Sequence, residues 1–93
     1  MAQASGRVGR LLRQVRVGMI VYDRHHAQVG TVTAVHLGGE GPLAAPRGRL
    51  AHGCVAIEVD PLGPKRYAAG GQIATVDGER VLLNVGRDYL TTP

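Results

Sequence analysis

Aromatic side chains are scarce in this sequence of 93 residues, which has no Trp, no Phe and three Tyr. A hydrophobic core must therefore be built from Val, Leu, Ile, Met and Ala. The same scarcity weighs against a protein that binds single-stranded nucleic acid by stacking bases on aromatic rings. Any contact with nucleic acid would have to rely on the phosphate backbone.

Cysteine and long apolar runs are lacking as well. Cys54 is the single cysteine, which excludes a disulfide within the chain. No run of apolar residues approaches the ~20 residues of a membrane-spanning helix, or the apolar core of a signal peptide. We therefore expect a soluble protein of the reducing cytoplasm, without a membrane span.

The sequence also lacks a recognisable set of catalytic or metal-binding residues. The candidate soft-metal ligands are four His and one Cys, whose spacing matches no known metal site: His25, His26, His36, His52 and Cys54. Cys54 would need a base to act as a nucleophile, and His52 is a same-face neighbour along the strand, not a partner in a triad. We expect no enzymatic activity, no cofactor and no metal. A small enzyme or metal-binding protein is the most distant alternative.

Acidic residues are absent from positions 1–16, which contain four of the eleven basic side chains. Seven basic residues then remain against seven acidic ones, so the rest of the chain is balanced. We treat residues 1–16 as a basic N-terminal arm that would suit an acidic partner surface. The candidate contacts for phosphate or a partner are the arginines of this arm and two more in a later loop: Arg7, Arg10, Arg13, Arg16, Arg47 and Arg49.

Apolar residues within the arm follow a helical period at Val8, Leu11, Leu12 and Val15. This spacing predicts a short amphipathic helix with the arginines on its opposite face. Because a helix of this length is marginal in water, it should form only if its apolar side packs on the domain or on a partner. A poorly ordered arm, or an organellar transit peptide, is the alternative interpretation.

Short runs rich in Val, Ile and Thr fill the rest of the chain, separated by Gly, Pro and Asp turn signals. We predict strands at 19–22, 28–37, 54–59, 65–69, 73–76 and 79–85, and a closing helical turn at 87–90. Asp77-Gly78 is a strong hairpin signal, and Gly30 suggests a bulge that bends the second strand. Residues 38–53 form a long Gly/Pro loop. This pattern predicts an all-β fold, a small antiparallel barrel of five to six short strands that buries one face.

Two stretches resemble the PRC-barrel family. The first resembles the family's opening hairpin, G-M-x-V-Y-D followed by V-G-x-V, and runs from Gly18 to Val35. The second resembles its closing half, an R-Y strand and an I-x-x-V-D-G-x-R-V-x-L hairpin, and runs from Arg66 to Leu83. The resemblance covers about residues 17–90 and leaves 91–93 as a tail. It implies an SH3-like barrel that acts as a bacterial adaptor without catalysis, since family barrels occur in the photosynthetic reaction-centre H subunit and in a ribosome maturation factor.

We therefore expect a protein–protein interaction module, with the loop 38–53 and the basic arm as its contact elements. Self-association into a homo-oligomer is compatible with this expectation. The alternative is an RNA- or ribosome-associated factor that binds phosphates through its arginine-rich arm.

Overall fold

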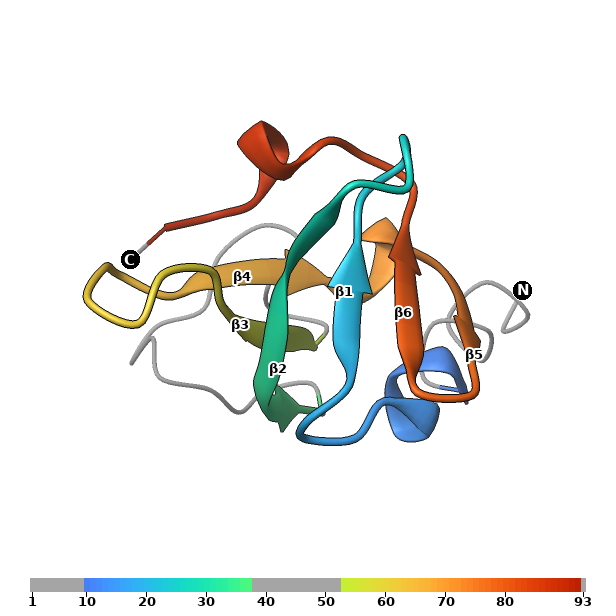
Figure 1. Ribbon diagram of the computed structural model, residues 1–93. Coiled ribbons are helices and arrows are strands. Elements are labelled where there is room, and N and C mark those ends of the chain that lie inside the picture. Colours follow the sequence, from blue (N-terminus) through green and yellow to red (C-terminus); the bar gives the residue numbers. More distant parts are fainter. Residues whose placement is uncertain (1–9, 38–52, 93) are drawn as a thin grey trace.

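Strands dominate the part of the chain that the computed structural model describes, residues 10–37 and 53–92 (Figure 1). Residues 10–14 form a short helix. The strands are β1 (Ile20–Tyr22), β2 (Gln28–His36), β3 (Cys54–Glu58), β4 (Arg66–Ala69), β5 (Ile73–Asp77) and β6 (Arg80–Leu83). Two 3₁₀ turns complete it, η2 (Gly70–Gln72) and η3 (Arg87–Tyr89). The predicted all-β class and the six predicted strand positions are confirmed.

The strands form one six-stranded sheet in the order β4-β3-β2-β1-β6-β5. Four neighbouring pairs are antiparallel, as predicted, but β1 and β6 are parallel. The expectation of a purely antiparallel arrangement is therefore wrong at this pair. The reason is that the β5–β6 turn lies beside the start of β1, where the Ile20 amide donates to the Glu79 carbonyl at 3.0 Å. Hairpin signals predict only the pairing of consecutive strands, and β1 and β6 are far apart in the sequence.

The two edge strands of the sheet, β4 and β5, are consecutive in the chain and are joined by η2. Gln72 of this turn is buried, and both the oxygen and the nitrogen of its side-chain amide form hydrogen bonds with the backbone. Its Oε1 accepts from the Ala69 amide at 2.9 Å, and its Nε2 donates to the Tyr89 carbonyl at 3.3 Å. Thr91 also exchanges two backbone hydrogen bonds with Tyr67, at 2.8 and 2.9 Å. The C-terminal segment therefore shields part of the outer edge of β4.

β2 pairs with β1 through its first half and with β3 through its second half, and it carries two irregularities. The register shifts at Val29 opposite β1 and at Thr33 opposite β3. Each shift inserts one residue, so the core-facing positions are Val29, Val32 and Val35. These bulges explain why the valines of this strand fall three apart instead of two. A regular strand would place Val29, Thr31 and Thr33 on one face, and the two bulges prevent this arrangement.

Gly30 allows β2 to cross closely over the end of β3. A Cβ atom at this position would collide with the carbonyl oxygen of Glu58 and lie 2.9 Å from its carbonyl carbon. Any side chain here would have to push the two strands apart. The predicted bulge therefore lies at Val29, beside Gly30, and the glycine itself serves a close approach of two backbones.

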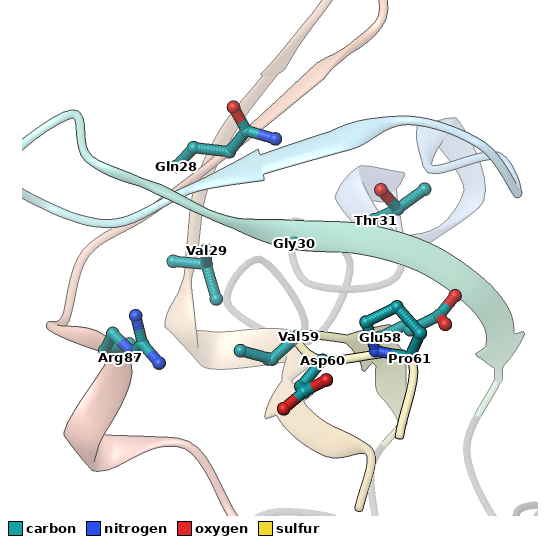
Figure 2. Close-up of a pocket in the computed structure, with 9 residues that line it drawn as sticks. All are labelled: Gln28, Val29, Gly30, Thr31, Glu58, Val59, Asp60, Pro61 and Arg87. Carbon is teal, nitrogen blue, oxygen red and sulfur yellow. The ribbon is translucent and has the colours of Figure 1, made fainter. Parts of the chain in front are cut away.

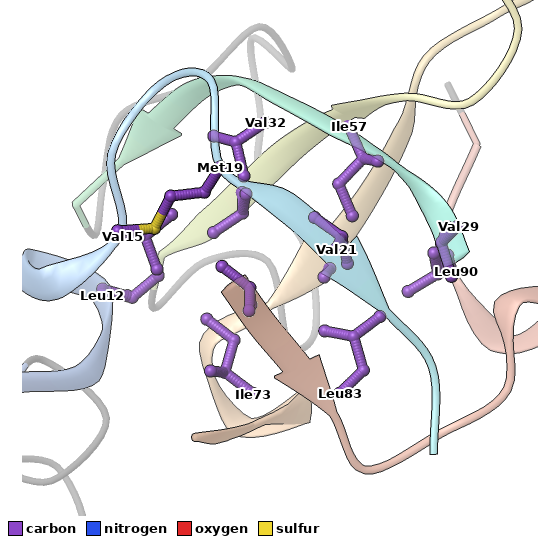
Figure 3. Packing of buried hydrophobic residues seen from close by; sticks show 13 residues of the cluster. Leu12, Val15, Met19, Val21, Val29, Val32, Ile57, Ile73, Leu83 and Leu90 are labelled. Atoms are coloured by element: carbon purple, nitrogen blue, oxygen red, sulfur yellow. The ribbon is translucent and has the colours of Figure 1, made fainter. Parts of the chain in front are cut away.

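The core lies between the two halves of the bent sheet and is aliphatic, as the composition requires. Leu12 and Val15 of the N-terminal segment are buried in it together with Met19 (Figure 3). Arg10, Arg13 and Arg16 are exposed to solvent. The amphipathic segment thus packs on its own domain, which leaves its apolar side covered and its arginines free to contact a partner.

β3 is buried on both faces, whereas burial of one face was predicted. Val55 and Ile57 face the main core, whereas Cys54 and Ala56 form a second cluster with Tyr67 and Ala69 of β4. Small side chains on this second side explain the pattern, because Ala and Cys are easily covered.

We predict that Gly30→Ala will lower the free energy of unfolding by about 3 kcal/mol, the upper end for an overpacked site, because β2 must move away from Glu58. Gly71→Ala is the matched control, since a Cβ there meets nothing within 4 Å. Urea unfolding followed by circular dichroism measures both. Equal stabilities of the two variants would contradict the close approach.

Candidate functional site

Three partly buried apolar side chains occupy the centre of the outer face of β1 and β6. Val21 and Val81 of these strands are fully buried, so their neighbours Ile20, Tyr22 and Leu82 point to the opposite side of the sheet. The parallel register places Tyr22 directly beside Leu82. Figure 1 looks onto this outer face, with β2, β1 and β6 in front of β3 and β4.

Polar residues surround this apolar centre, and strand pairing fixes their positions. Thr31 lies opposite Ile20, and Gln28 lies opposite Tyr22. On the other side, Arg80 is the neighbour of Ile20, and Thr75 is the neighbour of Leu82. We refer to Ile20, Tyr22 and Leu82, with these four rim residues, as the outer face.

A shallow pocket of about 540 Å³ continues the outer face at the end of β6. Leu82 belongs to both, so the pocket and the apolar centre are continuous. The pocket is lined by residues of β5, by the end of β6 and by the β1–β2 turn: Ala74, Thr75, Leu82, Leu83, Asn84, Asp23, Arg24 and His26. We call it the β6 pocket.

The β1–β2 turn that walls the β6 pocket is held by Asp23. Its Oδ1 accepts the backbone amides of His25 at 2.8 Å and Ala27 at 3.0 Å. The His26 amide donates to the Asp23 carbonyl at 2.9 Å, and His26 adopts a positive φ of 67°. The backbone amide of Arg24 donates to the Val85 carbonyl at 3.1 Å, which ties the turn to the segment after β6. The pocket wall is therefore fixed before any ligand arrives.

A second pocket, of about 620 Å³, opens where β2 crosses the end of β3. Figure 2 shows Val29, Val59 and Arg87 around this opening, whereas Gln28 and Thr31 lie on the other side of β2. Its charged groups are mixed, since Glu58 and Asp60 line it together with Arg87. The mixture of signs gives this pocket no clear preference for one ligand.

The predicted arginine contacts do not gather at either pocket as a group. Arg10, Arg13 and Arg16 lie on the exposed side of the N-terminal segment, spaced three residues apart. Arg7, Arg47 and Arg49 lie outside the described residues, as does most of the loop 38–53. The arginines that line pockets, Arg24 and Arg87, were not among the predicted contacts.

Cys54 is buried, and burial raises the pKa of its thiol. A raised pKa keeps the sulfur protonated, which is opposite to what a nucleophilic thiol or a metal ligand requires. Among residues 10–37 and 53–92, no three His, Cys, Asp or Glu side chains come together in a way that could hold a metal ion. In the same part of the chain, no helix is long and apolar enough to cross a membrane.

Sequence reasoning missed the outer face, although its signal is present. In β1 and β6, apolar residues occupy consecutive positions instead of alternating with polar ones. Because successive side chains of a strand point to opposite faces, each strand must present apolar side chains on its outward face as well. What the sequence could not supply is the pairing of β1 with β6, which brings Tyr22 and Leu82 together.

Comparisons of the chain with models of protein families, with curated proteins and with solved structures gave no match.

We predict that ionised Asp23 stabilises the fold and that this contribution to the free energy of unfolding is lost in acid. Hydrogen bonding from the Ala27 amide, with that from His25 and the charges of His25 and His26, holds the pKa of Asp23 below its ordinary value of 3.8, against the opposing effect of burial. A lowered folded-state pKa means that this stabilisation is complete above pH 3.8 and is lost as the pH falls through the folded value.

Urea unfolding at several pH values between 7 and 2 tests this. Asp23→Asn keeps an Oδ1 acceptor without the charge, so the variant should lose less stability in acid than the wild type does. Asp88→Asn, at an exposed position, is the control and should retain the wild-type dependence. A wild-type slope in Asp23→Asn would refute the assignment.

Proposed function

We propose that this chain is a non-catalytic module that binds a protein partner through its outer face. The observation that carries the proposal is the composition of this face: Ile20, Tyr22 and Leu82 at its centre, partly exposed, within a polar rim. Protein interfaces have this arrangement, with an apolar or aromatic centre low in charge and a hydrated polar edge. Rigid strands present the centre, which lowers the entropic cost of binding.

The scaffold of this proposed module is a small barrel of the PRC kind. Two features support closure of the sheet: edge strands β4 and β5 are joined by three residues, and Gln72 links the end of β4 to η3. β4 is followed, after η2, by the β5–β6 hairpin, which is the order of the R-Y strand and the hairpin in the family resemblance. A protonated, buried Cys54 suits the reducing cytoplasm as the compartment.

Replacing the apolar centre tests the function. We expect the double variant Tyr22→Thr, Leu82→Thr to retain the fold, because Thr suits strand positions. In affinity purification from nuclease-treated extract of the native host, we expect it to recover at least about tenfold less partner protein than the wild type does. Leu62→Ser is the matched control, since Leu62 is 97% exposed in a turn outside the outer face. Circular dichroism confirms folding of each variant. Equal recovery by the double variant and the control would refute the proposal, and sedimentation identifies a second copy of the chain as the partner.

A second candidate function is favoured by the exposed arginines of the N-terminal segment. Arg10, Arg13 and Arg16 recur every three residues, which places successive guanidinium groups along one side of the short helix and its exit. Because Leu12 and Val15 are buried in the core, this segment cannot insert an apolar side into a membrane without leaving its own domain. The remaining exposed side carries the positive charges of the three arginines and would suit the phosphates of an RNA.

The salt dependence of RNA binding tests this second function. With a fluorescein-labelled 20-nucleotide RNA, each of Arg10→Gln, Arg13→Gln and Arg16→Gln should reduce the slope of log K against log salt by about one unit. Lys65→Gln, an exposed cation elsewhere, is the control. These substitutions are preferable to deletion of residues 1–16, which would also remove Leu12 and Val15 from the core. Unchanged slopes would exclude the arginines as phosphate contacts.

A further inference from the structure

The β6 pocket combines an apolar floor with a wall that carries Arg24 and Asp23. Ala74 and Leu82 supply apolar surface, and Arg24 supplies a positive charge. The outer face beside it needs no such charge to bind an apolar segment. A ligand that pairs with Arg24 and also covers Leu82 must carry a negative group directly next to an apolar one.

We propose that the β6 pocket binds the C-terminal carboxylate of the partner chain, with the last side chain of that partner packed against Leu82. This inference rests on the proposed function, because it names the part of a protein partner that the outer face receives. The partner would lie as an extended segment over Tyr22 and Leu82 and end at the β1–β2 turn.

The groups around the pocket can satisfy a carboxylate. The Arg24 guanidinium can donate two parallel hydrogen bonds to its two oxygens, the strongest arrangement for this pair. Thr75 contributes a hydroxyl donor. Asn84 Nδ2 donates one hydrogen to the Gly71 carbonyl at 3.0 Å, which leaves its second hydrogen for a ligand. His26 adds an imidazole at the rim.

Asp23 is the one carboxylate among the residues that line the same pocket, and the turn orients it. Its Oδ1 accepts two backbone amides within the turn, which directs this oxygen toward the turn backbone. The Arg24 backbone is fixed independently by its bond to the Val85 carbonyl. The guanidinium is therefore presented on a rigid turn, and it is not paired with any carboxylate in the described part of the chain within 4.0 Å.

A chain terminus fits this pocket better than an internal acidic side chain does. In a terminal residue, the carboxylate and the side chain leave the same Cα atom, so one residue can reach both Arg24 and the floor at Leu82. An internal Asp or Glu places its charge at the end of its own side chain, and a different residue would have to fill the floor.

The experiment uses the full chain and an N-terminally immobilised library of random hexapeptides with free C-terminal carboxylates. The same library ending in carboxamides is the comparison, and it contains internal Asp and Glu at equal frequency. We expect selected peptides to end in Val, Leu or Ile and to bind about tenfold more weakly as amides, as expected for loss of a charged hydrogen bond. Arg24→Gln, which retains the backbone bond to Val85, should remove this difference, whereas Arg13→Gln should preserve it.

The outcomes separate this inference from the function on which it rests. If carboxylate and amide peptides bind equally and both are weakened by Tyr22→Thr, the carboxylate site is refuted while the outer face stands as a binding surface. Binding to neither library also refutes the inference, and the partner recovery of the Tyr22→Thr, Leu82→Thr variant then decides the proposed function by itself. Retention of the carboxylate preference in folded Arg24→Gln would overturn the assignment of Arg24.

Discussion

The close crossing of β2 over β3 at Gly30 is the constraint on which the rest of this small fold depends. One strand serves both halves of the sheet, pairing with β1 before the crossing and with β3 after it. The bulges at Val29 and Thr33 turn its valines inward on both sides of the crossing. Because Gly30 pairs with Val21 of β1, the same crossing lies beside the buried side of β1 and leaves Ile20 and Tyr22 on the outer face. Close packing of two backbones at one glycine thus determines which side chains form the outer face that we propose as the binding surface.

The two ends of the described chain reinforce this bent sheet with different interactions. At the N-terminal end, Leu12 and Val15 add apolar surface to a core that has no large aromatic side chain among its main-cluster residues. At the C-terminal end Leu90 is buried in the same core, and polar contacts are added through Gln72 and the backbone pairing of Tyr67 with Thr91. A domain this small buries a limited fraction of its surface, so segments outside the sheet matter for stability. Residues 10–16 of the basic arm provide such a segment, since Leu12 and Val15 pack in the core.

Much of the fold could be predicted from local sequence signals, and the candidate site could not. Turn residues such as Asp77-Gly78 and short runs rich in Val and Ile such as 54–59 depend on neighbours in the chain, so they identify hairpins and strands directly. The parallel pairing of β1 with β6 and the burial of β3 on both faces depend on residues distant in the sequence, for which a single sequence carries no local signal. The β6 pocket has the same origin, since Arg24 and Thr75 meet only through that pairing. The predicted arginines formed an obvious charge pattern, whereas the pocket arginine Arg24 stood alone beside two histidines in a turn.

The outer face and the arginines of the N-terminal segment belong to one rigid unit, which has a consequence for ligands that use both. The linker between them is fixed at three points: Gly18 donates to the Val32 carbonyl at 2.9 Å, Val32 donates to the Met19 carbonyl at 2.9 Å, and Ile20 donates to the Glu79 carbonyl at 3.0 Å. Residues 10–16 cannot swing relative to β1 unless these bonds break and Val15 leaves the core. A partner that carries both an apolar terminus and an acidic surface would therefore meet the two sites in a single fixed geometry. Since no flexible tether separates the sites, the second contact would require little additional ordering of this chain, and the two binding energies would combine with a small entropic loss.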